Sequence, residues 1–188
     1  MESNKRTLIG TVCYHLLSNH SVGPVLLPQI KSLDLPPNVV VEEMNWGPIA
    51  IVQYFQTLEI PFEKVVFLVA LERPERQIGD INIYKWEGNL PSETQIQACI
   101  GDAATGVISV ENLLVIGEFF NIWPKELYLL DIEPGPEMAG EHLSEDLKAK
   151  VPEILETLEY LALNGPRDKA LVGVLRGDEL FNKKENAS

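Results

Sequence analysis

The 188-residue chain is poor in cysteine, histidine and positive charge, with two cysteines, three histidines and 15 basic residues against 28 acidic ones. Cys13 and Cys99 lack the paired spacing of a zinc motif, which favours buried thiols over a disulfide or a metal cluster. The net charge of −13 argues against nucleic-acid binding, because phosphate recognition needs clustered lysine and arginine. No apolar stretch approaches the ~20 residues of a membrane span, and the polar start Met1–Asn4 lacks a signal-peptide pattern. We therefore expect a cytoplasmic protein without membrane insertion.

Motifs that mark common enzyme classes are also missing. The chain has no GxGxxG or P-loop sequence for phosphate groups and no Gly-x-Ser-x-Gly nucleophile elbow. Cys13 and His15 lie two residues apart and could form a thiol–base pair, but a buried Cys13 is the simpler interpretation. Ser18 and Ser21 flank His20, yet neighbours in one loop do not make a catalytic triad. The sequence by itself assigns no catalytic residue.

Apolar runs with strand character alternate with helical periodicity along most of the chain. The predicted strands are Thr7–Val12, Asn38–Glu43, Lys64–Leu71, Ile81–Trp86 and Leu127–Ile132. Most of these runs are apolar throughout, which suits a parallel sheet covered on both faces, whereas the alternation in Ile81–Trp86 predicts an antiparallel edge strand. The predicted helices are Val25–Leu33, Ile49–Leu58, part of Glu93–Ala98, Val110–Phe120 and one opening at Ser144. The pattern predicts an α/β three-layer sandwich, with a twisted, mostly parallel sheet of about five strands and helices on both faces.

One domain is expected to span residues 1–164. Asn164-Gly165-Pro166 ends the last predicted helix, so residues 165–188 form a C-terminal extension. Within it, Ala170–Leu175 could add a short strand. Phe181–Ser188 is polar and is expected to be disordered.

One stretch of the chain resembles a known family. Leu130-Asp131-Ile132-Glu133-Pro134, followed by Gly140 and then Leu143-Ser144, is similar to the C-terminal third of hydrogenase maturation proteases. Those enzymes carry an Ile-Glu-Pro or Ile-Gln-Pro strand end, a loop with glycine, and Leu-Ser at the start of the last helix. They are nickel-recognising endopeptidases that trim the C-terminal tail of the large subunit of nickel–iron hydrogenase. The resemblance covers roughly Thr7 to Leu163 and implies the same fold, with a hydrogenase large subunit as a candidate protein partner.

The resemblance also places the family's metal ligands on positions of this chain. If Val22-Gly23-Pro24 is aligned with the end of the family's first loop, the first metal-binding carboxylate falls on His20. The second falls on Glu42, or on Glu43 if the register slips by one. The third ligand, a histidine in the family, falls on Thr105 or, one residue on, Gly106. The implied metal ligands are therefore His20 and Glu42, with the third position altered.

Other departures from the family pattern accompany that change. No histidine lies between His20 and His142, so the loss of the third ligand does not depend on alignment detail. Cys13 and Tyr14 stand where the family has a glycine and an asparagine, which removes a tight glycine turn. Val69 stands where family members often place an aspartate.

A nickel or zinc site needs imidazole or carboxylate ligands that converge from separate strand ends. His20 and Glu42 could supply two of them, with His15, Glu43 or Asp102 as candidates for a third. The alternative interpretation makes His20 a solvated loop residue and Glu42 an exposed strand end. A further acidic group is expected to be a solvated loop rather than a cation site; its members are Asp131, Glu133, Glu137 and Glu141.

Two functions stay open on these residues. The first is a divergent maturation endopeptidase that recognises a basic tail or a nickel-loaded subunit. The second is a non-catalytic binding or assembly protein that keeps the scaffold and has lost the site. A shared scaffold cannot decide between them, because one fold can host unrelated functions.

Overall fold

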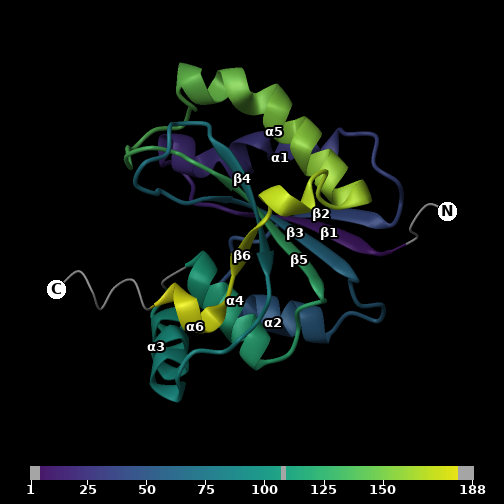
Figure 1. Cartoon of the computed structure of the whole chain (residues 1–188), viewed down its shortest axis with the longest axis vertical. Coiled ribbons are helices and arrows are strands. Elements are labelled where there is room, and N and C mark those ends of the chain that lie inside the picture. Colours follow the sequence, from purple (N-terminus) through teal and green to yellow (C-terminus); the bar gives the residue numbers. More distant parts are fainter. Residues whose placement is uncertain (1–4, 107–108, 182–188) are drawn as a thin grey trace.

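A computed structural model describes residues 5–106 and 109–181, and it contains one six-stranded sheet between two layers of helices (Figure 1). The strands lie side by side in the order β2-β1-β3-β5-β4-β6. Strands β2, β1, β3 and β5 are parallel, β4 runs antiparallel to β5, and β6 runs parallel to β4. The bounds are β1 Thr7–Val12, β2 Val39–Glu43, β3 Lys64–Ala70, β4 Ile81–Trp86, β5 Glu126–Ile132 and β6 Gly173–Leu175.

Each face of the sheet carries its own hydrophobic core. Helices α1 (Val22–Lys31) and α5 (Glu145–Asn164) cover one face. Helices α2 (Pro48–Gln56), α3 (Glu93–Ala104) and α4 (Val110–Phe119) form the layer on the other (Figure 1). Alternate residues of β3 enter the two cores, and all of them are buried, which is why this strand is apolar throughout. The predicted three-layer sandwich is confirmed, with six strands in place of about five.

Serine caps define where three helices begin. Ser109 accepts a hydrogen bond from the backbone N–H of Asn112, and Ser144 accepts one from the N–H of Leu147, as the two predicted helix starts require. A capping box at Ser92 opens α3, which is longer than the predicted helical part of Glu93–Ala98. These local signals place α4 and α5 correctly on the sheet.

Helix α1 begins earlier than its sequence pattern predicts. It starts at Val22, directly after a single 3-10 turn at Ser18–Ser21, so Gly23 and Pro24 belong to its first turn. The predicted start at Val25 is wrong, because a proline in the first helical turn sacrifices no intrahelical hydrogen bond. The polar segment after β1 is correspondingly short.

The C-terminal extension contributes to the sheet. Its short strand β6 pairs with β4, so β4 is antiparallel as predicted but does not lie at the edge. A last helical turn, α6 (Gly177–Leu180), is held by hydrogen bonds from Gly177 N to Gly88 O and from Asp178 N to Asn89 O, both 2.8 Å. The tail predicted to be disordered falls at residues 182–188, outside the part of the chain that the structure describes.

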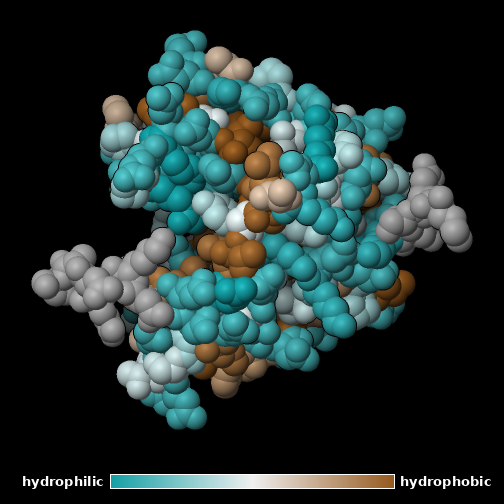
Figure 2. Space-filling model, in the orientation of Figure 1, coloured by the Kyte–Doolittle hydropathy of each residue, from teal (hydrophilic) through white to brown (hydrophobic). Residues whose placement is uncertain are grey.

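The surface in this view is mostly hydrophilic, with apolar side chains gathered near its centre, around the line of β4 and β6 (Figure 2). Leu171 and Val174, near and within β6, are exposed. Over the described ranges 5–106 and 109–181, no helix has the length and apolar composition needed to cross a membrane.

Candidate functional site

Loops that follow β1, β3 and β5 meet at the carboxyl edge of the parallel strands, where open α/β sheets place their ligands. Asn19, in the loop after β1, joins this loop to the one after β5. Its Nδ2 donates to Pro134 O at 2.9 Å and to Ser144 Oγ at 3.0 Å, and its Oδ1 accepts from Ser144 N at 2.8 Å. The Asn19 side chain is buried, so these bonds form without competition from water.

A short stretch of backbone pairing continues this junction. Gly140 N donates to Leu16 O and Ser18 N donates to Gly140 O, both at 2.9 Å. Ser18 Oγ donates to His142 O at 3.0 Å. Leu16 and Ser18 have positive φ angles of 60° and 49°, a left-handed conformation that costs energy for residues other than glycine. The two loops therefore form one bonded unit that holds locally strained backbone.

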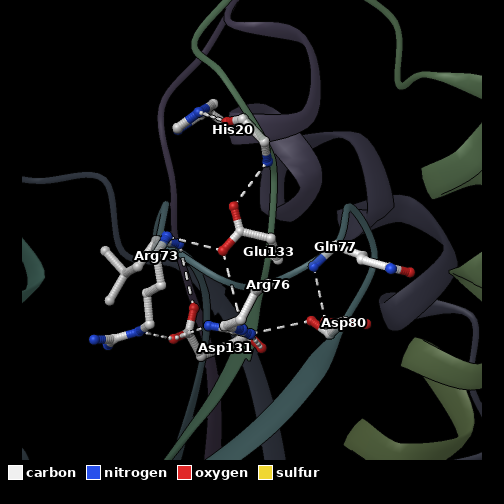
Figure 3. Close-up of polar contacts among 9 residues, drawn as sticks. His20, Arg73, Arg76, Gln77, Asp80, Asp131 and Glu133 are labelled. Carbon is white, nitrogen blue, oxygen red and sulfur yellow. Dashed lines mark hydrogen bonds and ion pairs between the residues drawn. The ribbon is translucent and has the colours of Figure 1, made fainter.

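His20 lies inside this unit. The residue is 7% exposed, and its Nε2 is 3.0 Å from the carbonyl oxygen of Gly135 (Figure 3). A carbonyl only accepts hydrogen bonds, so Nε2 is the donor in this contact. The alternative expectation of a solvated loop histidine is wrong.

Glu133, the glutamate of the Ile-Glu-Pro strand end, orders the backbone around it. Its Oε1 accepts from Gly135 N at 3.0 Å, and its Oε2 accepts from Arg73 N at 2.9 Å (Figure 3). The side chain is almost fully buried. Glu133 thus links the loop that carries the His20 acceptor to the loop after β3.

Asp131 is the centre of a buried ion-pair network. Its Oδ2 accepts from Arg73 Nε at 2.9 Å and from Arg76 Nη1 at 3.0 Å, and its Oδ1 accepts from Leu71 N at 3.2 Å (Figure 3). Asp131 is 0% exposed. Burial raises the pKa of its carboxyl group, and the two guanidinium groups oppose that shift. The network fastens the segment after β3 to the end of β5.

The acidic group was predicted to be a solvated loop, and this is wrong for its two N-terminal members. Asp131 and Glu133 are buried, whereas Glu137 and Glu141 are exposed. The arginine partners of Asp131 and Glu133 come from the loop after β3, because the parallel register sets Val69 opposite Asp131. The pair of arginines so soon after the predicted third strand was the sequence signal that could have indicated this network.

A second polar group lies at the carboxyl ends of β1 and β2. The Nε2 atom of His15 contacts Glu43 Oε1. Asn45 Nδ2 donates to the same Glu43 oxygen at 2.7 Å, and Asn45 Oδ1 accepts from Cys13 N at 3.0 Å. This chain of contacts orients the ring of His15 through its Nε2 atom. The sequence offered His15 and Glu43 as separate third-ligand candidates, and the structure brings them together.

The remaining predicted residues lie apart from His20. Glu42 is opposite Gly10 on the sheet face covered by α2. There the pKa of Tyr54 is raised mainly by burial of its hydroxyl and in addition by the charge of Glu42. Thr105 is an exposed residue at the end of α3, and its hydroxyl donates to the carbonyl of Asp102 at 2.8 Å. His20, by contrast, directly precedes α1, which covers the opposite face.

A resident three-ligand metal site does not fit this arrangement. Within residues 5–106 and 109–181, no group of three histidine, cysteine, aspartate or glutamate side chains is placed to hold a metal ion. The acid groups nearest His20 are engaged by the arginines, as shown for Asp131 and Glu133. His20 and Glu42 stay predicted ligands only for a metal that arrives with a substrate.

The protein therefore belongs to the α/β class with an open, mostly parallel sheet, and hydrogen-bonded loops cover the carboxyl edge of that sheet. No protein-family model and no curated protein sequence matches the chain. Solved structures do match it. The hydrogenase 2 maturation peptidase from a Thaumarchaeota archaeon is 22% identical with a TM-score of 0.56, over 86% of this chain and 100% of that one.

Two further structures give the same result. The hydrogenase maturating endopeptidase HybD from E. coli is 17% identical with a TM-score of 0.57, over 80% of this chain and 88% of that one. The nickel–iron hydrogenase maturation protease HybD from Thermococcus kodakarensis is 17% identical with a TM-score of 0.55, over 84% and 99%. This chain therefore has the fold of the hydrogenase maturation proteases.

Proposed function

We propose that this protein acts in nickel–iron hydrogenase maturation, as a protein of the maturation-protease type that recognises a large-subunit precursor. The observation that carries the proposal is the junction of the two carboxyl-edge loops. Glu133, Gly140 and Ser144, which carry the family resemblance, belong to the bonded unit that also contains Asn19 and His20. The fold of known maturation endopeptidases supports the same function.

In the endopeptidase form of this proposal, nickel is part of the substrate and arrives in the large subunit. The proposed contacts to the nickel-bearing substrate are the imidazole of His20 and the carboxylate of Glu42, which meet it at separate points because the two side chains lie apart. The oriented imidazole of His15 is the third candidate contact, since Glu43 holds its Nε2. Such a protein would act in the cytoplasm, and cell fractionation can test this location.

A second candidate function is that of a non-catalytic binding or assembly protein. It is favoured by the lack of a three-ligand group over the described ranges. It is also favoured by the pairing of Asp131 and Glu133 with arginines, because carboxylates engaged in this way are poor general bases.

The two candidates differ in what happens to a nickel-loaded large-subunit precursor mixed with the protein. Loss of the C-terminal tail, read by intact-mass spectrometry, supports the endopeptidase. A stable complex without cleavage, detected by size-exclusion chromatography, supports the binding protein. If neither cleavage nor a complex is found, the proposed function is wrong.

A double variant, His20→Ala with Glu42→Ala, tests the proposed contacts. Cleavage or nickel-dependent affinity is expected to fall by about tenfold or more, since each ligand lost weakens a metal contact substantially. The matched control is His142→Ala with Glu59→Ala, which removes two exposed side chains of the same types. Calorimetry with nickel and zinc alone is expected to show no tight site. Micromolar binding that is lost in the double variant would instead support a preformed metal site in this protein.

A further inference from the structure

Strand β2 is an edge of the sheet, and within residues 5–106 and 109–181 one side of it has no strand partner. It pairs with β1 alone. At its two ends, Thr7 N donates to Asn38 O at 2.9 Å and Met44 N donates to Thr11 O at 2.8 Å. In a parallel ladder, the backbone groups of alternate residues point to opposite sides of a strand. The N–H and C=O groups of the even-numbered residues of β2 therefore point toward β1, and those of Val41 and Glu43 point outward.

This edge lacks several of the devices that protect an exposed strand, and its charged residues, Glu42 and Glu43, lie only at its end. It contains three consecutive valines, no proline, no lysine and no bulge in its pairing with β1. Over the described ranges, no hydrogen bond ends on the outward backbone groups of Val41 or Glu43. An extended segment could therefore continue the sheet here.

Side chains beside the edge indicate which segment fits. On the α2 face, Val40 and Tyr54 pack against the same core, and Glu42 lies near Tyr54. The Tyr54 ring packs edge-on against Trp46 at a centroid distance of 5.3 Å. Trp46 is 38% exposed. The side chain of Glu42 makes no hydrogen bond or ion pair within residues 5–106 and 109–181, in contrast to that of Glu43. A free carboxylate beside two aromatic rings is suited to a lysine or arginine side chain.

We propose that the outer edge of β2 binds an extended, basic segment of a protein partner, which adds to the sheet as a further strand. Its backbone pairs with the outward groups of Val41 and Glu43. Its alternate side chains fall beside Val40 and Glu42, at the roughly 4.5–5.5 Å spacing of cross-strand neighbours, so a basic residue reaches the Glu42 carboxylate. The net charge of −13 attracts such a segment and disfavours pairing between two copies of this chain.

This proposal deepens the proposed function and rests on it for the identity of the partner. The expected segment is the tail of the large-subunit precursor. The edge also leads from Val39 to Glu43, where the oriented His15 lies, so a bound segment would run toward the carboxyl-edge loops.

The test measures fluorescence anisotropy of a labelled short peptide of alternating lysine and valine, in the presence of a chelator. Three peptides are compared: the lysine peptide, the same peptide with glutamate in place of lysine, and the lysine peptide N-methylated at alternate residues. The lysine peptide is expected to bind about tenfold or more tightly than the other two. Equal binding of the N-methylated peptide would show attraction by charge alone and would overturn strand addition.

Variants on the two sheet edges provide the matched pair. Val41→Pro removes an outward N–H without removing a bond to β1, and Val174→Pro does the same on β6, whose Leu175 O bonds inward to Glu87 N. Val41→Pro is expected to weaken binding of the lysine peptide about tenfold, and Val174→Pro is expected to leave that affinity unchanged. Equal effects of the two prolines would overturn the proposal.

A charge variant provides a second test that does not depend on Val41→Pro being folded. Glu42→Gln alters no described hydrogen bond and is expected to weaken the lysine peptide about fivefold to tenfold without lowering the melting temperature. Unchanged affinity would overturn the role of Glu42. A dimer lost in Glu42→Gln would identify a second copy as the occupant and would also overturn the proposal. If the peptide binds but the precursor does not, the docking edge stands and the proposed function fails.

Discussion

Asn19 and Ser144 are joined by two hydrogen bonds across a sequence separation of 125 residues. Ser144 N donates to Asn19 Oδ1 at 2.8 Å, and Asn19 Nδ2 donates to Ser144 Oγ at 3.0 Å. Ser144 is also the N-cap of α5. One buried amide therefore orders the start of a 20-residue helix and the loop that follows β1.

The first prediction concerns this amide. Asn19→Ala leaves Pro134 O and the backbone N–H of Ser144 without their buried partners, so the free energy of unfolding should fall by about 2 to 4 kcal/mol. The matched control is Asn164→Ala, because Asn164 is exposed and makes one side-chain bond of 3.4 Å. The control should change stability by about 0.5 kcal/mol or less. Urea unfolding followed by circular dichroism measures both, and equal losses would contradict the role of Asn19.

Local patterns predicted most of the fold. Strand β3 is an unbroken apolar run because both of its faces are buried, and Ser109 and Ser144 mark helix starts through their own caps. The start of α1 was missed because Gly23-Pro24 has the same letters in a loop end and in a first helical turn. Signals contained within a few residues were therefore readable, and ambiguous ones were not.

The candidate site depended on contacts between distant segments. Asp131 meets Arg73 and Arg76 only because β3 and β5 pair in a particular register, and no single stretch of sequence states that register. The contact of His15 with Glu43 likewise requires β1 to lie beside β2. The sequence named most of these residues but could not say which of them touch.

The second prediction tests the buried ion-pair network. Arg76 is 12% exposed in its side chain and contacts Asp131 at 3.0 Å, so Arg76→Ala leaves a buried carboxylate partly unpaired. The expected loss of stability is about 3 kcal/mol. Arg167→Ala is the matched control, since Arg167 pairs with Glu156 at 2.6 Å with both side chains more than half exposed. That loss should be about 0 to 1 kcal/mol. A loss at position 76 as small as that at position 167 would show that the network is not stabilising.

The third prediction tests the close packing of α1 on β1. A Cβ atom at Gly23 would lie 2.9 Å from Cys13 Sγ and from Thr11 Cβ, which forces the helix away from the strand. Gly23→Ala should therefore cost about 1 to 3 kcal/mol. Gly101→Ala, in helix α3 with nothing within 4 Å of the new atom, should instead stabilise by about 0.5 to 1 kcal/mol. Thermal unfolding of the two variants should shift the melting temperature in opposite directions, and a neutral Gly23→Ala would show that the interface can yield.

The fourth prediction addresses the proposed domain of residues 1–164. A chain that ends at Asn164 lacks β6 and loses the bond from Glu87 N to Leu175 O, which is 3.0 Å. It should keep its far-ultraviolet circular dichroism but melt earlier and self-associate through the uncovered edge of β4. The control ends at Phe181 and should behave as the full chain. Sedimentation velocity separates the two, and a monomeric, equally stable 1–164 chain would show that the extension adds nothing to the fold.

The last prediction concerns pH and the Cys13 thiol. Burial raises the pKa of Cys13 from its ordinary value of 9.0 to about 12, so the folded protein keeps this proton after the unfolded chain has released it. Unfolding then releases a proton, and stability falls as the pH rises above 9.0. One pH unit above that value, the wild type should have lost about 1.4 kcal/mol more than Cys13→Ala, relative to neutral pH.

Urea unfolding of both proteins across this range measures the difference, and tyrosine ionisation contributes equally to both curves. Parallel curves would show that Cys13 titrates normally in the folded state. A thiol held protonated in this way is a poor nucleophile, so iodoacetamide should label Cys13 only when the protein unfolds. Rapid labelling of the native protein at Cys13 would contradict its burial and would reopen the thiol–base pair with His15.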